Sequence, residues 1–305
     1  MAPFGPGPLS SRRPRRVLPP AAGGERGSRA RGPLAVVAAS LLLAAAPAAS
    51  APARSSSGVI VAKLVWGEQP VERAESGSAS WRRLREGEAL RTGDHLRTSA
   101  SGVARLDFPW MAVTLGPSSE LSVPPKAVLS TVLERGRAEF SGEGRDIVKI
   151  EVGEGEIRGG GRLVLWREGK RTAATALAGA FRVSARGGTV EIRAGEGTTI
   201  SDGGPPAEAG PLPGSPGELV PGPDPVYVQA GKPAELRWRA EANTHHIEVL
   251  ALKSDDVLLA RNVGTPPARL EIPWLGTFRW RVSSRDPSGV ESPPSAPGYV
   301  CVVEK

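Results

Sequence analysis

The sequence has a single cysteine, Cys301, among 305 residues, which excludes an intramolecular disulfide. Its stability must therefore come from packing, unlike that of small disulfide-rich secreted scaffolds. Cys301 lies in an alternating apolar run, residues 299–303, close to the end of the chain. A free cysteine in such a run is predicted to be a small buried hydrophobic residue, without a role as a thiol.

Signatures of catalysis and of metal binding are scarce. There are three histidines, of which His95 sits in a Gly-Asp turn, while His245 and His246 are adjacent. Adjacent residues of a strand point to opposite faces, so this pair cannot chelate one metal ion with both rings. The sequence also contains no G-x-S-x-G nucleophile elbow and no GxxxxGK[ST] phosphate loop. We therefore expect no enzyme activity, no cofactor and no metal site.

Amphipathic helical spacing is not sustained anywhere after residue 58. Instead, apolar and polar residues alternate with a period of two, as in residues 59–65, 103–108, 147–152 and 189–193. Such runs predict half-buried strands, and the frequent glycines between them predict turns. The sequence thus predicts an all-β protein.

The positive net charge belongs mostly to the N-terminal 53 residues. They contain seven arginines and one acidic residue, which leaves 32 basic and 31 acidic residues in 54–305. The remaining net charge of +1 gives no electrostatic basis for binding nucleic acid. No nucleic-acid partner is expected.

Residues 1–53 have the three parts of a secretory signal. An arginine-rich segment precedes an apolar run, residues 34–46, and small-residue cleavage sites follow at residues 49–51 and 51–53. We predict cleavage after Ala53 and a periplasmic or cell-surface protein. The alternative is an uncleaved inner-membrane anchor with the later domains outside the cytoplasm. However, residues 34–53 reach the length of a membrane span only by including two prolines. No cysteine lies near the cleavage site, which excludes a lipoprotein anchor.

Residues 58–202 form the first predicted domain, in which an ordered set of motifs stands out. An aromatic residue, a Gly turn, Gly-Asp, and then Arg and Thr occur within residues 81–98, and a later strand pair carries a glycine and a phenylalanine. The motif residues are Trp81, Gly87, Gly93, Asp94, Arg97, Thr98, Gly136 and Phe140. This set resembles the FecR domain, which implies a many-stranded, twisted, solenoid-like β domain in a bacterial envelope protein. Glycine and aspartate suit a tight turn, so we interpret these residues as structural.

The regulatory members of the FecR family carry a cytoplasmic anti-sigma segment before their membrane span. The first 33 residues here are rich in arginine and proline and show no helical pattern. The resemblance therefore gives little support to sigma-factor regulation by this chain.

A Pro/Gly-rich linker, residues 203–225, separates the first domain from a second, residues 226–305. Proline density of this kind predicts an extended, semi-rigid spacer. Six or seven short strands in the second domain predict a small β-sandwich. Its Leu-x-Trp and Phe-x-Trp-x-Val motifs resemble an immunoglobulin or fibronectin-type-III-like fold, which implies that Trp238 and Trp280 face each other in the core.

Trp66, Trp81, Trp110 and Trp166 lie at predicted strand ends or beside turns. Packing is one role for them. Partial exposure is the other, and exposed aromatics on a β surface suit contact with a glycan or a protein. The favoured hypothesis is a non-enzymatic, exported binding or interaction module whose partner is an envelope polysaccharide or an envelope protein. The alternative is a membrane-tethered, FecR-like sensor in transmembrane signalling or sigma-factor regulation.

Overall fold

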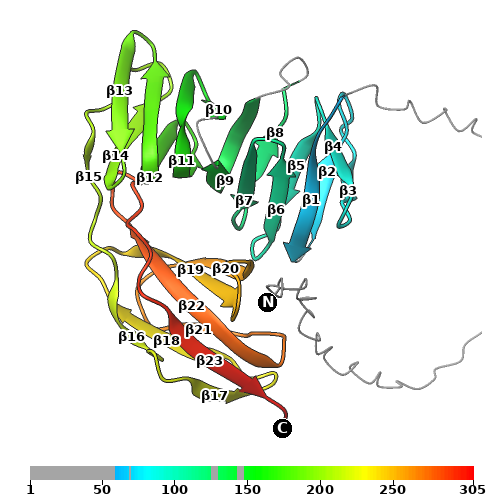
Figure 1. The fold of residues 1–305 in the computed structure, drawn as a ribbon, viewed down its shortest axis with the longest axis vertical. Coiled ribbons are helices and arrows are strands. Elements are labelled where there is room, and N and C mark those ends of the chain that lie inside the picture. Colours follow the sequence, from blue (N-terminus) through cyan, green and yellow to red (C-terminus); the bar gives the residue numbers. More distant parts are fainter. Residues whose placement is uncertain (1–58, 69, 125–129, 143–147) are drawn as a thin grey trace, which may run out of the picture.

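The computed structural model describes residues 59–68, 70–124, 130–142 and 148–305 (Figure 1). The predicted leader, residues 1–53, lies outside this part. The all-β prediction is confirmed: the described residues form strands and turns and contain no helix. Accordingly, they include no helix long and apolar enough to cross a membrane.

The first domain is built on one twisted 15-stranded sheet. Its strands are β1 (Ile60–Glu68), β2 (Val71–Ala74), β3 (Trp81–Arg83), β4 (Ala89–Arg91), β5 (His95–Thr98), β6 (Val103–Phe108), β7 (Met111–Leu115), β8 (Glu120–Ser122), β9 (Ser130–Gly142), β10 (Val148–Val152), β11 (Gly155–Glu168), β12 (Arg171–Ala185), β13 (Gly188–Arg193), β14 (Glu196–Ser201) and β15 (Gly210–Pro211). The main path runs β15-β14-β12-β11-β10-β9-β7-β6-β1-β4, and β13 pairs with β12 while β2, β3, β5 and β8 form a branch from β9. Because the sheet coils, one face of nearly every strand contributes to a single core that runs from Val61 to Ile200.

The second domain is a sandwich of a three-stranded and a five-stranded sheet. Its strands are β16 (Gly217–Val220), β17 (Val226–Gln229), β18 (Ala234–Arg239), β19 (Thr244–Ala251), β20 (Val257–Val263), β21 (Ala268–Leu270), β22 (Gly276–Arg285) and β23 (Gly298–Val303). The sheet orders are β16-β18-β21 and β17-β23-β22-β19-β20. Both sheets contribute to a common core.

Trp238 and Trp280 lie in this core, with ring centroids 6.5 Å apart in an edge-to-face arrangement. The prediction that they face each other is confirmed. Trp280 also donates a hydrogen bond from Nε1 to the carbonyl oxygen of Pro221 at 3.0 Å, which satisfies its buried N–H group.

Cys301 differs from its prediction because it is half-buried. In β23 the alternation directs Val300 and Val302 into the core, so Cys301 lies on the opposite face of the strand. The predicted alternating strand is present, but Cys301 lies on the strand face that points away from the core.

Residues 203–225 are attached to both domains. Near its start, the segment pairs with the first domain through β15 and through a bridge between Ile200 and Pro206. Near its end, β16 pairs with β18 of the sandwich. These pairings hold the segment along the two domains, which lie side by side in Figure 1.

The two domains contact each other through two buried apolar groups. Val103 of β6 packs with Leu250, Val257 and Ala260 of the sandwich. Further along, Val290, in the segment that follows β22, packs against Val164, Trp166 and Ala173 of β11 and β12. Charged side chains of the two domains also pair across this interface, beside the cleft that is the candidate site.

Candidate functional site at the domain interface

The FecR-like motif residues form the turns and core of the first domain. Asp94 is buried, and its Oδ2 accepts a hydrogen bond from the backbone N–H of Arg91 at 2.8 Å. Gly87 and Gly93 have φ angles of 82° and 90°, a region that favours glycine. Thr98 donates from Oγ1 to the carbonyl oxygen of Gly116 at 2.6 Å. In these contacts the side chains of the motif residues hydrogen-bond backbone groups of the first domain.

Gly136 and Phe140 of β9 complete the motif. Gly136 has a φ of 84°, and a Cβ at this position would lie 2.6 Å from the Cα of Ser119, so only glycine fits this close approach. Phe140 is 1% exposed and belongs to the core. At the buried turn, the carboxylate of Asp94 also lies 3.5 Å from the guanidinium of Arg73, an ion pair that suits a structural role for the motif.

The aromatic candidates have different surroundings. Trp81 is half-buried, and the guanidinium of Arg97 lies 4.1 Å from its ring centroid. Trp110 is half-buried and packs against Phe108, with the two ring centroids 5.8 Å apart. Trp66 belongs to β1, but its side chain lies outside the described part of the structure.

Of the two roles open to Trp166, packing and partial exposure, the structure shows packing, because the residue is only 9% exposed. The second domain covers it: Val290 packs against it, and the guanidinium of Arg285 lies 4.3 Å from its ring centroid. The sequence placed Trp166 at a strand end but gave no sign that another domain docks on it.

The docking surface is the second face of strands that already contribute to the core. In β9, β11 and β12 one set of alternate residues packs inward, and the set between them faces the sandwich. The outward set includes Arg137, Glu139, Val164, Trp166, Ala173 and Thr175. The corresponding sandwich face belongs to β19 and β22, where His246, Glu248, Arg281 and Ser283 are cross-strand neighbours.

Arg137 lies at the centre of this interface and is 3% exposed. Its Nε and Nη2 donate to the two carboxylate oxygens of Glu291 at 2.9 and 3.0 Å, a bidentate pair between the domains. Its Nη1 lies 3.3 Å from Oε1 of Glu248 on β19. One buried arginine thus joins two buried carboxylates of the second domain.

The acceptor side is equally well occupied. Glu291 also accepts hydrogen bonds from Nε1 of Trp166 and, at 2.6 Å, from Oγ of Ser283. Its backbone N–H donates to Oγ1 of Thr175 on β12 at 3.0 Å. Glu291 is therefore held from β9, β11 and β12 at once.

Two further pairs balance the charge. Glu248 accepts from Arg281 at 2.6 Å, and Glu139 accepts from Arg162 at 2.6 Å. With Arg137 and Glu291 they make three arginines and three carboxylates, which we call the interdomain ion cluster: Arg137, Glu139, Arg162, Glu248, Arg281 and Glu291. Buried charges are stable only when paired and hydrogen-bonded, and each member here has a partner of opposite sign.

The cluster shifts the proton affinity of its members. Burial alone would raise the pKa of Glu248 and of Glu291. At Glu248 the positive charges of Arg281 and Arg137 outweigh burial and lower the pKa. At Glu291 the positive charge of Arg137 does the same. Burial would lower the pKa of Arg137, but the two carboxylates outweigh it and raise that pKa. The charged forms are therefore the stable ones.

His245 and His246 lie on opposite faces of β19, as the sequence predicted. His245 packs edge-on against Trp238 in the sandwich core, and burial lowers its pKa. His246 packs edge-on against Trp166, and its Nδ1 lies 2.7 Å from Oδ1 of Asn262. Within the described residues, no group of three His, Cys, Asp or Glu side chains could hold a metal ion.

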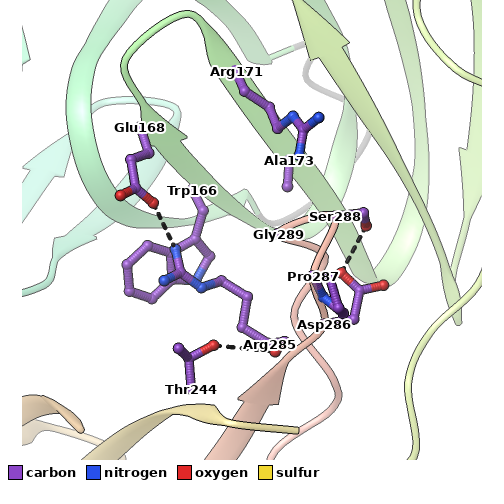
Figure 2. A pocket seen from close by; sticks show the side chains of 10 residues that line it. All are labelled: Trp166, Glu168, Arg171, Ala173, Thr244, Arg285, Asp286, Pro287, Ser288 and Gly289. Carbon is purple, nitrogen blue, oxygen red and sulfur yellow. Dashed lines mark hydrogen bonds and ion pairs between the residues drawn. The ribbon is translucent and has the colours of Figure 1, made fainter. Parts of the chain in front are cut away.

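Beside the cluster, the two domains enclose an open cleft of about 400 Å³ (Figure 2). One wall comes from the hairpin of β11 and β12, and the other comes from the end of β22 and the turn that follows it. The lining residues are Trp166, Glu168, Arg171, Ala173, Thr244, Arg285, Asp286, Pro287, Ser288 and Gly289. A second cavity of about 230 Å³ shares Trp166, Thr244 and Arg285 with this cleft and continues toward His245 and His246.

The turn that forms the second wall is held firmly. Asp286 accepts hydrogen bonds from Oγ of Ser288 at 2.6 Å and from the backbone N–H of Val290 at 3.0 Å. Gly289 approaches β12 so closely that a Cβ there would lie 3.2 Å from the Cβ of Ala173. The wall formed by this turn is therefore held in place against β12.

Sequence reasoning missed Arg137, Glu248, Glu291 and Arg285, although a signal was present. Residues 163–166 and 172–176 are continuous, mostly apolar runs, and all nine residues are buried. Uninterrupted runs of this kind are typical of strands covered on both faces. They could have indicated a second packed layer over β11 and β12.

Comparison with known proteins assigns no family to this chain. No family model matches it. A search of the curated proteins also found no match. Two crystal structures of a "putative anti-sigma factor" from Parabacteroides distasonis ATCC 8503 are similar at 13% and 12% identity, each with a TM-score of 0.33, and each match covers 38% of this chain. The chain spans 59% of the length of those structures, and a likeness of this degree carries no argument about function. The resemblance to the FecR domain stays a prediction.

Proposed function

We propose that this chain is an exported, non-catalytic binding protein of the bacterial envelope and that its ligand occupies the cleft between the two domains. The observation that carries the proposal is the cleft itself, with one wall from each domain. Ligand sites occur preferentially in concave surfaces at domain interfaces, where a few polar groups fix the orientation of the ligand.

The state of the lining groups favours binding over proton transfer. The carboxylate of Asp286 is engaged by Ser288 and Val290, and the guanidinium of Arg285 stacks on Trp166. The described residues that line the cleft include no histidine and no cysteine, the residue types most often used as general base and as thiolate nucleophile, and His245 and His246 line only the adjoining cavity. Its polar groups suit the positioning of a ligand.

The interdomain ion cluster supports a preformed site. Trp166 forms part of the cleft and at the same time donates to the buried Glu291. Since Arg137 holds the same carboxylate from β9, the two walls are fixed before any ligand arrives. A preorganised site avoids the entropic cost of ordering its walls on binding.

An exported binding protein should lack its leader. We expect the protein recovered from its native host to be soluble in the periplasm or bound at the cell surface, and to begin near Arg54. Fractionation with intact-mass measurement and N-terminal sequencing tests this. A full-length species in the inner membrane would contradict it and would favour the membrane-tethered sensor.

Filling the cleft should abolish binding. Thr244 is exposed and lines both cavities, so Thr244→Trp places a large ring at their shared rim. We expect the immobilised wild-type protein to retain polysaccharide or protein from the host envelope fraction, and Thr244→Trp to lose this retention at least tenfold, which is about 1.4 kcal/mol.

Thr189→Trp is the matched control, because Thr189 is also an exposed strand threonine whose hydroxyl makes one hydrogen bond, to Ser184 at 3.1 Å. It lies on β13 and does not belong to the cleft lining. Equal retention by both variants would place the binding site elsewhere. No retention by the wild-type protein would refute the binding function.

A further inference from the structure

The acidic groups of the cleft have hydrogen-bond or ion-pair partners, whereas one of its basic groups has none within the described part of the chain. Its two carboxylates are engaged, Glu168 with Arg285 at 3.5 Å and Asp286 with Ser288 and Val290. Arg171, in contrast, is exposed, and no ion pair or side-chain hydrogen bond joins it to another described residue. In Figure 2 its guanidinium lies above the turn at Ser288 without a partner. A ligand thus meets a free cation in the cleft and carboxylates that already have donors.

Arg285 can supply a second positive group. Its guanidinium stacks on Trp166, and its ion-pair partner, Glu168, is 84% exposed. A pair at this distance is weak when one partner, here Glu168, is exposed to solvent. A carboxylate of a ligand can therefore compete with Glu168 for Arg285 while the stacking on Trp166 is kept, whereas Arg171 is available without displacing any partner.

The backbone around the cleft is not available to a peptide strand. Strand β12 pairs with β11 and β14. The cleft end of β22 pairs with β19 on one side and, on the other, with the segment that follows it, through the bridge between Arg285 and Glu291. A bound peptide commonly adds to a free sheet edge, and these strands have none at the cleft. Recognition must therefore use side chains: guanidinium groups, the hydroxyls of Thr244 and Ser288, and an apolar wall.

We propose that the ligand is an acidic glycan, with the carboxylate of a uronic-acid-type sugar between Arg171 and Arg285. The sugar ring packs against Pro287, the exposed apolar residue of the lining. Arginine is suited to this role because its planar fork matches a carboxylate. This inference rests on the proposed binding function and names the ligand class of the same cleft.

The test uses uronate trisaccharides of galacturonate, glucuronate and mannuronate, each beside its neutral methyl ester, in calorimetric titrations of the protein. We expect at least one acid to bind, its methyl ester to bind at least tenfold more weakly, and affinity to fall with added salt. Arg171→Gln should weaken binding of the acid about 10- to 100-fold, since a hydrogen bond to a charged group contributes about 1.5–3 kcal/mol.

Arg182→Gln is the matched control, because Arg182 is another exposed arginine of β12 and does not line the cleft. Failure of all three acids to bind, equal binding of acid and ester, or equal effects of Arg171→Gln and Arg182→Gln would each overturn the acidic-glycan inference. The inference would also be overturned if a triglutamate peptide bound instead of the uronates and its binding were weakened in the same way by Arg171→Gln.

The Thr244→Trp variant separates these failures from failure of the proposed function. If Thr244→Trp abolishes retention of the envelope fraction while the uronates do not bind, the cleft binds a ligand of another class. If Thr244→Trp changes nothing, the cleft is not the binding site, and both proposals fail.

Discussion

Replacing Arg137 with alanine should destabilise the protein by about 3–5 kcal/mol. The expected loss is large because Arg137 is 3% exposed and is the shared partner of Glu291 and Glu248. Without it, two carboxylates of the sandwich stay buried against the first domain with too little positive charge. Denaturant unfolding followed by tryptophan fluorescence measures the effect, since Trp166 lies in the same interface.

The neighbouring Arg135 provides the control for this substitution. It also lies on β9 and forms an ion pair, with Glu120 at 3.3 Å, but its side chain is 59% exposed. Exposed pairs contribute about 0–1 kcal/mol, so Arg135→Ala should change stability little. A loss below about 1 kcal/mol for Arg137→Ala as well would mean that the ion cluster does not hold the domains together.

The sequence was informative wherever local pattern and tertiary structure agree. Alternation in residues 103–108 matches β6, whose outward and inward residues are separated as the period of two requires. The two tryptophans of the second domain meet in its core because a sandwich directs alternate residues of both sheets inward. The Gly-Asp motif at residues 93–94 forms a tight turn, because glycine permits the positive φ and aspartate accepts a backbone N–H group.

The candidate site was not predictable by the same reasoning. Arg137 and Glu291 are 154 residues apart, and a single sequence contains no local sign that two such charges meet. A charged residue on an alternating strand indicates a solvated face by default. Here the second domain covers that face, which is also why Trp166 is buried near the end of its strand.

The ion cluster and the cleft are physically connected. Glu291 accepts from Trp166, Trp166 carries the stacked Arg285, and Arg285 lines the cleft. Changes in the cluster can therefore reach the cleft through two side chains. Measured affinities for cluster variants should be read together with their stability, because loss of docking also opens the cleft.

Replacing Glu291 with glutamine should destabilise the protein at neutral pH by about 3 kcal/mol. Glutamine has nearly the same shape, but it removes the negative charge that faces Arg137 and keeps one acceptor oxygen in place of two.

The wild-type protein should also lose stability as the pH falls below about 4.5. The folded-state pKa values of Glu291 and Glu248 are lowered below the ordinary glutamate value of about 4.5, so the unfolded chain takes up protons first. The stabilisation is therefore present above that pH and is lost as the pH falls through the folded-state values.

Unfolding curves between pH 7 and pH 3 distinguish the charge of Glu291 from its packing. Glu291→Gln should start from a lower stability and show a shallower decline below pH 4.5, because one of the two titrating carboxylates is gone. Glu120→Gln, which removes the partner of the exposed Arg135, should follow the wild-type curve closely. In a double-mutant cycle, Arg137→Ala and Glu291→Gln should be less than additive by about 0.5–3 kcal/mol, since each removes the partner of the other. If the two destabilisations are fully additive, and if the decline in stability below pH 4.5 is the same in Glu291→Gln as in the wild-type protein, the two side chains do not act as a buried ion pair.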